Sequence, residues 1–392
     1  MLIETNVEVN FRSIEEFTRV MASELLEDKI NFEILKEDNF IKIKVKSEKL
    51  NQSTEFSYVD LGNKIEDQVL TMCKISLLEL LDKKYDWGSL MGVRPTKVLR
   101  RLLINGCDYK EARKILKDFY LVTDEKINLM ETVVKKELEL LDKEHINLYI
   151  GIPFCPTKCK YCSFASYEIN GGVGRFYNDF VEALLKEIQI VGDFLKTYSK
   201  KVSSIYFGGG TPSTLTEEDL ERVLKKLLEN IDMTDVKEFT FEAGREDSLN
   251  VKKLEIMKKY SVDRISLNPQ SFNLETLKRV NRRFNRENFD LIFKEAKKLE
   301  FIINMDLIIG LPKETTEEIL DTLSQLKDYD IDNLTIHCLA FKRASKLFKE
   351  SQERKVIDRT LIEKHIQKIV EEKAMKPYYM YRQKNIIEWG EN

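Results

Sequence analysis

After Asn147 the sequence alternates between short apolar runs and longer amphipathic segments, and this alternation constrains the fold more than any other feature. Successive strand–helix units predict a parallel sheet with right-handed crossovers. We therefore expect an α/β fold, a partial (β/α)6 TIM-like barrel, with a doubly wound sheet as the structural alternative. The predicted strands are Leu148–Ile152, Ser203–Phe207, Glu238–Glu242, Arg264–Asn268, Ile302–Leu307 and Asn333–Cys338. The predicted helices are Phe176–Phe194, Glu217–Leu228, Val251–Lys259, Phe289–Leu299 and Thr316–Leu326.

The residues before the barrel show a different organisation. Residues 1–86 are predicted to form a small α+β domain, residues 87–146 a helical connector, residues 147–345 the barrel, and residues 346–392 a helix with the start of a C-terminal region. In the first domain we expect strands at Val7–Phe11, Asn31–Leu35, Phe40–Val45 and Glu55–Val59, and helices at Ser13–Leu26 and Ile65–Leu81. A basic group in the connector is either a solvated helical face or an anion-binding surface; it comprises Arg94, Lys97, Arg100 and Arg101.

Composition excludes several classes of function. The 392 residues carry 64 Lys and Arg against 67 Asp and Glu, a net charge of −3, which gives no general reason to expect nucleic-acid or membrane binding. The N-terminus lacks the basic and apolar regions of a signal peptide, and no 18 apolar residues run uninterrupted, so no membrane span is expected. We expect a cytoplasmic protein with reduced cysteines.

Three of the six cysteines fall within eight positions, directly after the first predicted barrel strand. Cys155, Cys159 and Cys162 have C-x3-C-x2-C spacing, which allows a short loop to present three thiolates to three irons of one cluster. No fourth Cys or His follows in the loop, although closed zinc sites and ordinary ferredoxin clusters use four protein ligands. The spacing predicts an open 4Fe–4S site; structural zinc and unligated thiols are the alternatives.

Further candidate residues follow the later strands. Gly209, Gly210 and Thr211 come directly after the second predicted strand, where glycines permit close approach of a ligand to the backbone. The C-terminal strand ends of α/β barrels collect ligand-binding groups. The candidates there are Glu242, Gln270, Arg282 and Asp306, and His337 and Cys338 are placed near the same expected cavity with a weaker indication.

The cysteine motif resembles the cluster loop of the radical S-adenosylmethionine (SAM) enzymes. The flanking residues Tyr149, Pro153-Phe154 and Tyr161 resemble the oxygen-independent coproporphyrinogen III oxidase (dehydrogenase) branch. The upstream stretch Trp87–Lys97 is similar to the HemZ-type subgroup of that branch. The resemblance extends from about residue 87 to the C-terminus and is weaker over residues 1–86.

The resemblance implies both cofactors and a reaction. It implies one 4Fe–4S cluster, whose open iron binds SAM, and a reduced flavodoxin or ferredoxin-type electron donor. Reductive cleavage of SAM would give a 5′-deoxyadenosyl radical that attacks propionate side chains of coproporphyrinogen III. Loss of carbon dioxide would then give the vinyl groups of protoporphyrinogen IX. The positions implied to hold SAM, including a second SAM molecule, are Tyr149, Tyr161, Gly209, Gly210, Thr211, Glu242, Gln270, Arg282, Asp306 and Ala340.

Departures from the family pattern leave other functions open. Gly151 stands where the dehydrogenases have histidine, and Phe164 where they have an additional, non-ligating cysteine. The alternatives are a haem-binding chaperone of the same fold and an anaerobic radical SAM enzyme that methylates or opens a porphyrin ring. The aromatic and basic stretch Pro377–Asn385 could stack on a macrocycle, or it is an amphipathic packing segment. Only seven residues follow it, so we expect a chain shortened at the C-terminus, with SAM cleavage poorly coupled to decarboxylation.

Overall fold

The computed structural model describes residues 2–6, 12, 14–15, 17–18, 25, 29–59, 61, 64–90, 94–142, 144–350 and 355–381. Two compact units divide the chain. The first comprises Met1–Leu140 with Pro377–Gln383, and the second comprises Leu141–Lys376 with Lys384–Asn392. The predicted strand Val7–Phe11 and most of the predicted helix Ser13–Leu26 lie outside the described residues. The predicted domain boundary at residue 86 remains a prediction.

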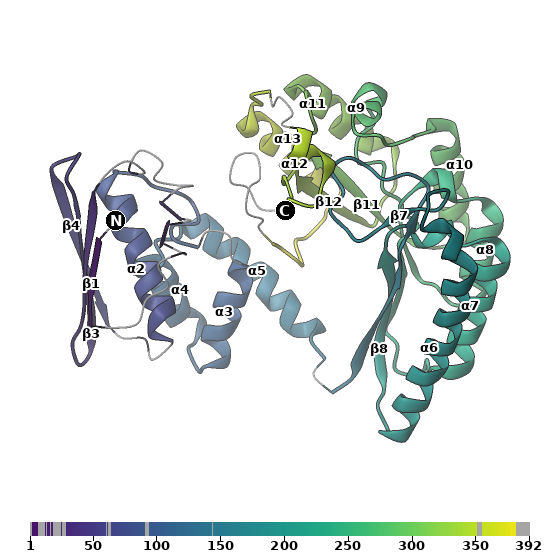
Figure 1. Cartoon of the computed structure of the whole chain (residues 1–392), viewed down its shortest axis with the longest axis horizontal. Coiled ribbons are helices and arrows are strands. Elements are labelled where there is room, and N and C mark those ends of the chain that lie inside the picture. Colours follow the sequence, from purple (N-terminus) through teal and green to yellow (C-terminus); the bar gives the residue numbers. More distant parts are fainter. Residues whose placement is uncertain are drawn as a thin grey trace. The chain divides into compact units, whose positions relative to one another are not determined.

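The first unit contains a four-stranded sheet in the order β1-β2-β3-β4, covered by helices (Figure 1). Strand β1 pairs with β2 in parallel, and the other pairs are antiparallel. Alternate residues of β2 and β3 are buried, as expected for a sheet with one covered face, and α2 buries Val69 and Met72. The elements are β1 Leu2–Thr5, β2 Ile30–Lys36, β3 Phe40–Ser47, β4 Gln52–Val59, α2 Ile65–Leu80, α3 Pro95–Ile104, α4 Tyr109–Asp118 and α5 Asp124–Leu140.

The basic group of the predicted connector lies in this first unit. Arg100 is 3.8 Å from Glu137, and Arg101 is 3.8 Å from Asp67. Two of the four cations therefore have carboxylate neighbours within their own unit. This pairing favours a structural role over the anion-binding alternative.

The second unit is built on a six-stranded sheet whose order, β12-β11-β10-β9-β8-β5, follows the chain without reversal. All neighbouring strands are parallel. A doubly wound sheet would reverse its strand order at a switch point, so that alternative is wrong and the partial-barrel prediction is confirmed. The strands are β5 Ile146–Ile152, β8 Val202–Gly209, β9 Glu238–Phe241, β10 Arg264–Ser266, β11 Ile302–Ile309 and β12 Asn333–Cys338, with a small pair formed by β6 Phe154–Cys155 and β7 Tyr167–Glu168.

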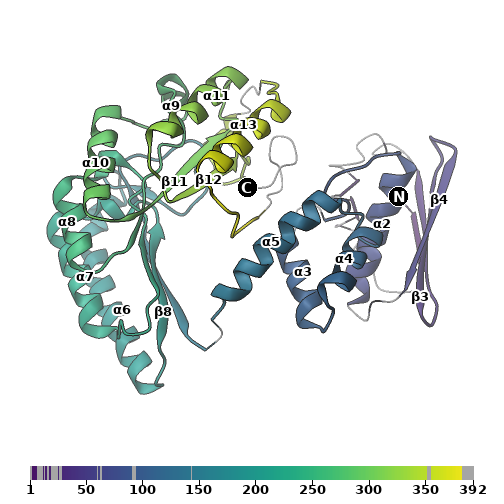
Figure 2. The ribbon, with the colours of Figure 1, turned by 180° about the vertical axis from the view of Figure 1, so that it is seen from behind.

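Helices cover the outer face of this curved sheet, with α6, α7 and α8 side by side (Figures 1 and 2). The helix Thr316–Ser324 continues as a 3-10 turn, so the predicted Thr316–Leu326 is nearly matched. Among the described residues no helix is long and apolar enough to cross a membrane. The helices are α6 Tyr177–Thr197, α7 Glu217–Asn230, α8 Val251–Lys259, α9 Leu274–Arg279, α10 Arg286–Lys298, α11 Thr316–Ser324, α12 Lys346–Glu350 and α13 Arg359–Glu372.

The two faces of the barrel sheet differ in chemistry. Outward-facing residues such as Ile205, Phe207 and Met305 are buried and form one apolar core with the helices. The alternate positions, which face the barrel interior, are largely polar: Ser204, Tyr206, Thr240, Glu242, Ser266, Asn268, Asn304, Asp306, Thr335 and His337. The interior of this partial barrel can therefore bind a polar ligand.

Candidate active site

The cysteine loop follows β5, and its two ends pair as the short parallel strands β6 and β7. The amide of Tyr167 donates to the carbonyl of Pro153 (2.8 Å), and the amide of Ile169 donates to the carbonyl of Cys155 (2.9 Å). The carboxylate of Glu168 accepts a hydrogen bond from the amide of Lys158 (2.9 Å). These bonds fix both ends of the loop before any ligand binds.

Each of the three sulfurs has a polar neighbour. Thr211 Oγ1 donates to Cys155 Sγ at 3.3 Å, and Cys162 Sγ lies 3.8 Å from the hydroxyl of Ser166. Arg245 Nη1 lies 3.8 Å from Cys159 Sγ. Burial raises the pKa of the Cys155 thiol, while its hydroxyl neighbours oppose that shift. Hydrogen-bond donors around sulfur are suited to stabilising thiolate ligands.

The glycine-rich turn after β8 packs directly against the cysteine loop. The amides of Gly210 and Thr211 donate to the carbonyls of Ile152 and Phe154, each at 2.7 Å. Gly209 has a φ of +105°, a conformation that favours glycine. A Cβ atom on Gly210 would lie 2.6 Å from the carbonyl oxygen of Phe154. The turn therefore requires glycine to approach the loop this closely.

We expect Gly210→Ala to lower the free energy of unfolding by about 1–3 kcal/mol and to weaken SAM binding, because the added methyl group forces the turn away from Phe154. Gly172→Ala is the matched control, since a Cβ atom there would meet nothing within 4 Å. Thermal unfolding and equilibrium SAM binding of the two variants measure the difference. Equal behaviour of the two variants would contradict the close-approach argument.

Two tyrosines and a carboxylate line one wall of the barrel interior. Tyr149 is 64% exposed and stacks on Tyr206 with ring centroids 5.9 Å apart. The hydroxyl of Tyr206 donates to Glu242 Oε1 at 2.5 Å. Burial raises the pKa of Glu242 to about 7, the Tyr206 hydrogen bond lowers it, and the charge of Asp306 raises it. Glu242 can therefore hold or release a proton near neutral pH.

This raised pKa predicts that Glu242→Gln stabilises the cofactor-free protein at alkaline pH. Between pH 4.5 and about 7 the native state keeps a proton that the unfolded state releases. The contribution of Glu242 to stability is therefore complete below pH 4.5 and is lost progressively as the pH rises to about 7, and the glutamine variant has no such loss. We expect the variant's advantage in unfolding free energy to grow by about 2 kcal/mol from pH 5 to pH 8. Denaturant unfolding at both pH values tests this, with exposed Glu229→Gln as control; a pH-independent difference would contradict it.

Asp306 lies in the same polar interior, on β11. Its two carboxylate oxygens accept hydrogen bonds from the side-chain amides of Asn268 and Asn304, each at 2.9 Å. Nε2 of His337 on β12 lies 3.7 Å from Asp306 Oδ2. These amides hold the carboxylate in one orientation, with an imidazole beside it. Cys338, the next residue on the strand, belongs to the opposite face of the sheet and pairs with Ile309, which favours the packing alternative for this residue.

Arg282 and Gln270 carry polar atoms that are buried and unpaired among the described residues. Arg282 is 6% exposed, and its Nη2 donates to the carbonyls of Gly244 (2.8 Å) and Asn268. Its Nε has no hydrogen-bond partner there, and neither does Gln270 Oε1. Gln270 has a φ of +68° and is held by main-chain bonds to Asp306 and Ile308. Unpaired buried polar atoms are costly, so these atoms are suited to binding a polar ligand.

The remaining SAM candidates lie at the ends of the site. Tyr161 is half-buried against an apolar cluster that contains Val280, Leu311, Leu339 and Leu347. Burial and the neighbouring Cys159 raise the pKa of Tyr161. Ala340 is buried two residues after β12 ends. The structure thus brings most of the SAM candidates to the carboxyl end of one sheet. Which part of SAM each residue contacts remains a prediction.

The sequence did not predict two residues that hold the candidate residues in place, Arg245 and Asn268. Arg245 is 4% exposed, forms a two-point ion pair with Asp247, and donates to the carbonyl of Thr157 (3.0 Å) as well as contacting Cys159. Asn268 orients Asp306, as described above. Arg245 follows Glu242 by three residues on the same strand–helix loop, and this position is the signal that could have found it.

The residues fit a cluster better than a single metal ion. Within the described part of the chain no group of three or more His, Cys, Asp or Glu side chains is arranged to hold one metal ion. Three free thiols on one loop suit three irons of a 4Fe–4S cluster, and the unpaired buried atoms of Arg282 and Gln270 suit a polar ligand such as SAM.

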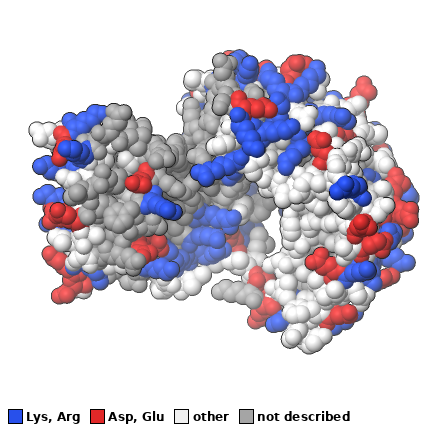
Figure 3. Space-filling view, in the orientation of Figure 1, with Lys and Arg blue, Asp and Glu red and all other residues white. Residues whose placement is uncertain are grey.

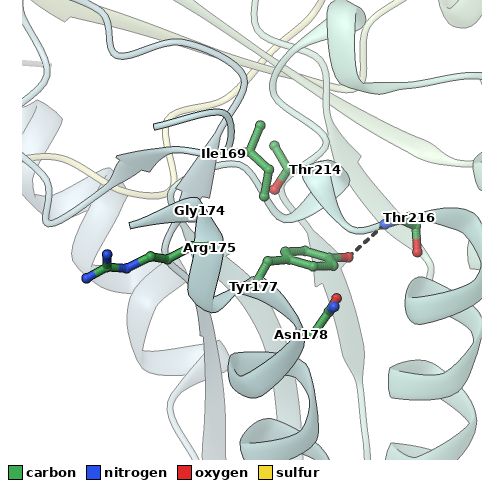
Figure 4. Close-up of a pocket in the computed structure, with 7 residues that line it drawn as sticks. All are labelled: Ile169, Gly174, Arg175, Tyr177, Asn178, Thr214 and Thr216. Atoms are coloured by element: carbon green, nitrogen blue, oxygen red, sulfur yellow. Dashed lines mark hydrogen bonds between the residues drawn. The ribbon is translucent and has the colours of Figure 1, made fainter. Parts of the chain in front are cut away.

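A separate pocket of about 300 Å³ lies beside the glycine-rich turn (Figure 4). It is lined by Ile169, Gly174, Arg175, Tyr177, Asn178, Thr214 and Thr216 and contains none of the cluster or SAM candidates. The hydroxyl of Tyr177 accepts a hydrogen bond from the amide of Thr216 (3.0 Å) and donates to Asp219 (2.9 Å). These bonds join the start of α6 to the start of α7, which indicates a structural role for this tyrosine.

Comparison with known proteins identifies the class. The radical SAM superfamily matches residues 149–326, the span that holds the cysteine loop and most of the candidates. These residues form a radical SAM domain, and a 4Fe–4S cluster and SAM are its cofactors. Within the superfamily the chain is similar to the oxygen-independent coproporphyrinogen-III oxidase-like protein HemZ of Bacillus subtilis, with 40% identity over 311 residues, 77% of this chain and 62% of that protein.

Two further relatives are named for different functions. The heme chaperone HemW of Bacillus subtilis is 31% identical over 197 residues, 49% of each chain. The solved coproporphyrinogen III oxidase HemN of Escherichia coli superposes with a TM-score of 0.51 and 24% identity, over 61% of this chain and 54% of that one, and it shows the fold alone. The chain thus spans between 49% and 62% of the length of these relatives.

Proposed function

We propose that this protein is a radical SAM enzyme of tetrapyrrole biosynthesis, which oxidatively decarboxylates two propionate side chains of coproporphyrinogen III to the vinyl groups of protoporphyrinogen IX. The 40% identity to a coproporphyrinogen-III oxidase-like protein over 77% of the chain carries this proposal. When bound, the cluster and SAM supply reductive SAM cleavage and hydrogen-atom abstraction. Reduced flavodoxin or a ferredoxin-type protein, in the cytoplasm, would provide one electron for each SAM cleavage, and each substrate radical would pass one electron to a one-electron acceptor as it loses carbon dioxide.

The residues of the chain have defined tasks in this proposal. Cys155, Cys159 and Cys162 hold the cluster, and Thr211 and Arg245 stabilise two of their sulfurs through the contacts described above. The glycine-rich turn admits the amino-acid end of SAM close to the cluster loop. The remaining SAM contacts, including those to a second SAM molecule, would come from Tyr149, Tyr161, Glu242, Gln270, Arg282, Asp306 and Ala340.

The polar interior also explains how the substrate would be positioned. Glu242 and Asp306 are acceptors held by Tyr206, Asn268 and Asn304, so their orientation does not depend on the ligand. Preorganised groups of this kind lower the cost of orienting a reactant. The sheet face and its helices exclude water from the other side of the strands.

A haem chaperone is the second candidate, because the chaperone relatives share the same part of the chain at about 30% identity. Anaerobic incubation with coproporphyrinogen III, SAM and a reductant, followed by mass spectrometry, separates the two. We expect tri- and dicarboxylate products with matching carbon dioxide release. Unchanged coproporphyrinogen III together with stable haem binding and transfer would favour the chaperone, and a methylated or linear tetrapyrrole would favour porphyrin modification.

A further inference from the structure

The turn between β12 and α12 carries three exposed cations at the carboxyl end of the barrel sheet. Lys342, Arg343 and Lys346 are exposed, and among the described residues no ion pair to their side chains is found; we call Lys342–Lys346 the basic turn. Figure 3 shows Lys and Arg side chains gathered over the part of the second unit where α12 and α13 lie in Figure 1. Cations without carboxylate partners remain able to bind an anionic ligand.

The basic turn is rigid, although its charged side chains are exposed. Ser345 is 1% exposed, its amide and its hydroxyl donate to the carbonyl of Lys342 (2.9 and 2.8 Å), and its oxygen accepts from the amide of Phe348 (3.3 Å). Leu347 is buried in the neighbouring apolar cluster. The backbone that presents the cations is therefore fixed before a ligand arrives.

The basic turn is also attached to the cysteine loop. The amide of Leu347 donates to the carbonyl of Lys160, between the second and third cluster cysteines, at 3.1 Å. The ammonium of Lys160 forms an ion pair with Glu350 at 3.1 Å, so the one described carboxylate of α12 is already engaged. These contacts hold the three cations close to the cluster loop and just after Ala340.

We propose that the basic turn is a carboxylate clamp, in which Lys342 and Arg343, with Lys346, bind propionate carboxylates of the tetrapyrrole that are not reacting. The inference rests on the proposed function and names how that site would select its substrate. A tetracarboxylate whose reacting side chain points to the cluster must place other carboxylates at the rim of the barrel mouth. Charge-assisted hydrogen bonds from arginine and lysine recognise carboxylates there, and binding energy from remote groups positions the reacting one.

An acidic protein partner is a less suitable occupant. Stable protein interfaces bury about 1,200–2,000 Å², whereas the cations here fall within five residues of one short turn. Parallel strands present ligand-binding groups at their carboxyl ends, which is where this turn lies. The same variants still distinguish the two partners.

The test compares the cluster-loaded wild type with the double variant Lys342→Ala/Arg343→Ala. Two porphyrins serve as probes: coproporphyrin III and its tetramethyl ester, titrated anaerobically by fluorescence. We expect the double variant to bind coproporphyrin III roughly 10-fold or more weakly, and both proteins to bind the ester equally. Lys342→Arg/Arg343→Lys should keep most of the affinity. Lys225→Ala/Lys252→Ala removes the same charge from α7 and α8 and should change nothing.

Three outcomes would overturn the clamp. The first is equal affinity of wild type and double variant for coproporphyrin III, and the second is equal weakening of the variant's binding to the acid and to the ester. The third is unchanged porphyrin affinity in a double variant whose cluster is reduced more slowly by flavodoxin but not by dithionite. The last outcome would identify a docking surface for the electron donor. Carboxylate-dependent binding that needs Lys342 and Arg343, found in a wild type that does not decarboxylate, would refute the proposed function and leave the clamp standing.

Discussion

Replacing Cys155, Cys159 or Cys162 by alanine is expected to abolish reductive SAM cleavage, measured as 5′-deoxyadenosine released under anaerobic conditions with dithionite. In the proposed site each thiolate holds a different iron, and the loop offers no substitute ligand at this spacing. Iron and sulfide content after reconstitution should fall well below the roughly four irons expected for the wild type.

The other cysteines provide the controls. Cys107 is half-buried in the first unit, and Cys73 is fully buried in α2, where burial raises the pKa of its thiol. Cys107→Ala should retain both iron and SAM cleavage. Cys73→Ala should retain cleavage in the folded fraction. Wild-type 5′-deoxyadenosine release from any one of the three loop variants would refute the cluster assignment.

Replacing Arg282 by alanine is expected to reduce SAM cleavage more than 10-fold, roughly what losing a buried charge-assisted contact costs. Its guanidinium joins the carbonyls of Gly244 and Asn268, on the loops that follow β9 and β10, and lies beside Cys159 and Tyr161. Without this side chain the two loops lose a hydrogen-bond donor that they share, and the candidate site loses a positive charge. Iron content should stay near that of the wild type, because Arg282 is not a proposed iron ligand.

The adjacent arginine is a matched control for this variant. Arg283 is exposed, so Arg283→Ala removes the same charge one residue away and should leave SAM cleavage unchanged. Arg282→Lys keeps the charge with fewer donors and should fall between the two. If Arg282→Ala folds, keeps its iron and cleaves SAM at the wild-type rate, the residue does not contribute to the site.

The barrel was predictable because its signal is repeated. The strands of the six-stranded sheet coincide with apolar runs of strand length that alternate with helices, and β12 matches its predicted bounds, Asn333–Cys338. Adjacent residues on such a strand face opposite ways, which places His337 and Cys338 on different faces of the sheet. The short strands β6 and β7 were not predicted, since two residues carry no periodicity.

The candidate site was predictable only in part, because strand ends identify positions but not contacts. Glu242, Gln270 and Asp306 were expected near one another from their place after successive strands. The residues that orient them, Tyr206 and Asn268, are inner-face residues whose partners lie on neighbouring strands. Pairings across 36 or 38 residues depend on the register of the sheet, which the sequence pattern alone does not determine.

The proposed reaction is tested most directly by following the hydrogen atom that it removes. Coproporphyrinogen III carrying deuterium at the β-carbons of its propionates is incubated anaerobically with the cluster-loaded protein, SAM and dithionite. The account predicts deuterium in the released 5′-deoxyadenosine, together with products that have lost one and two carbon dioxide molecules. Unlabelled 5′-deoxyadenosine accompanied by intact coproporphyrinogen III would contradict it.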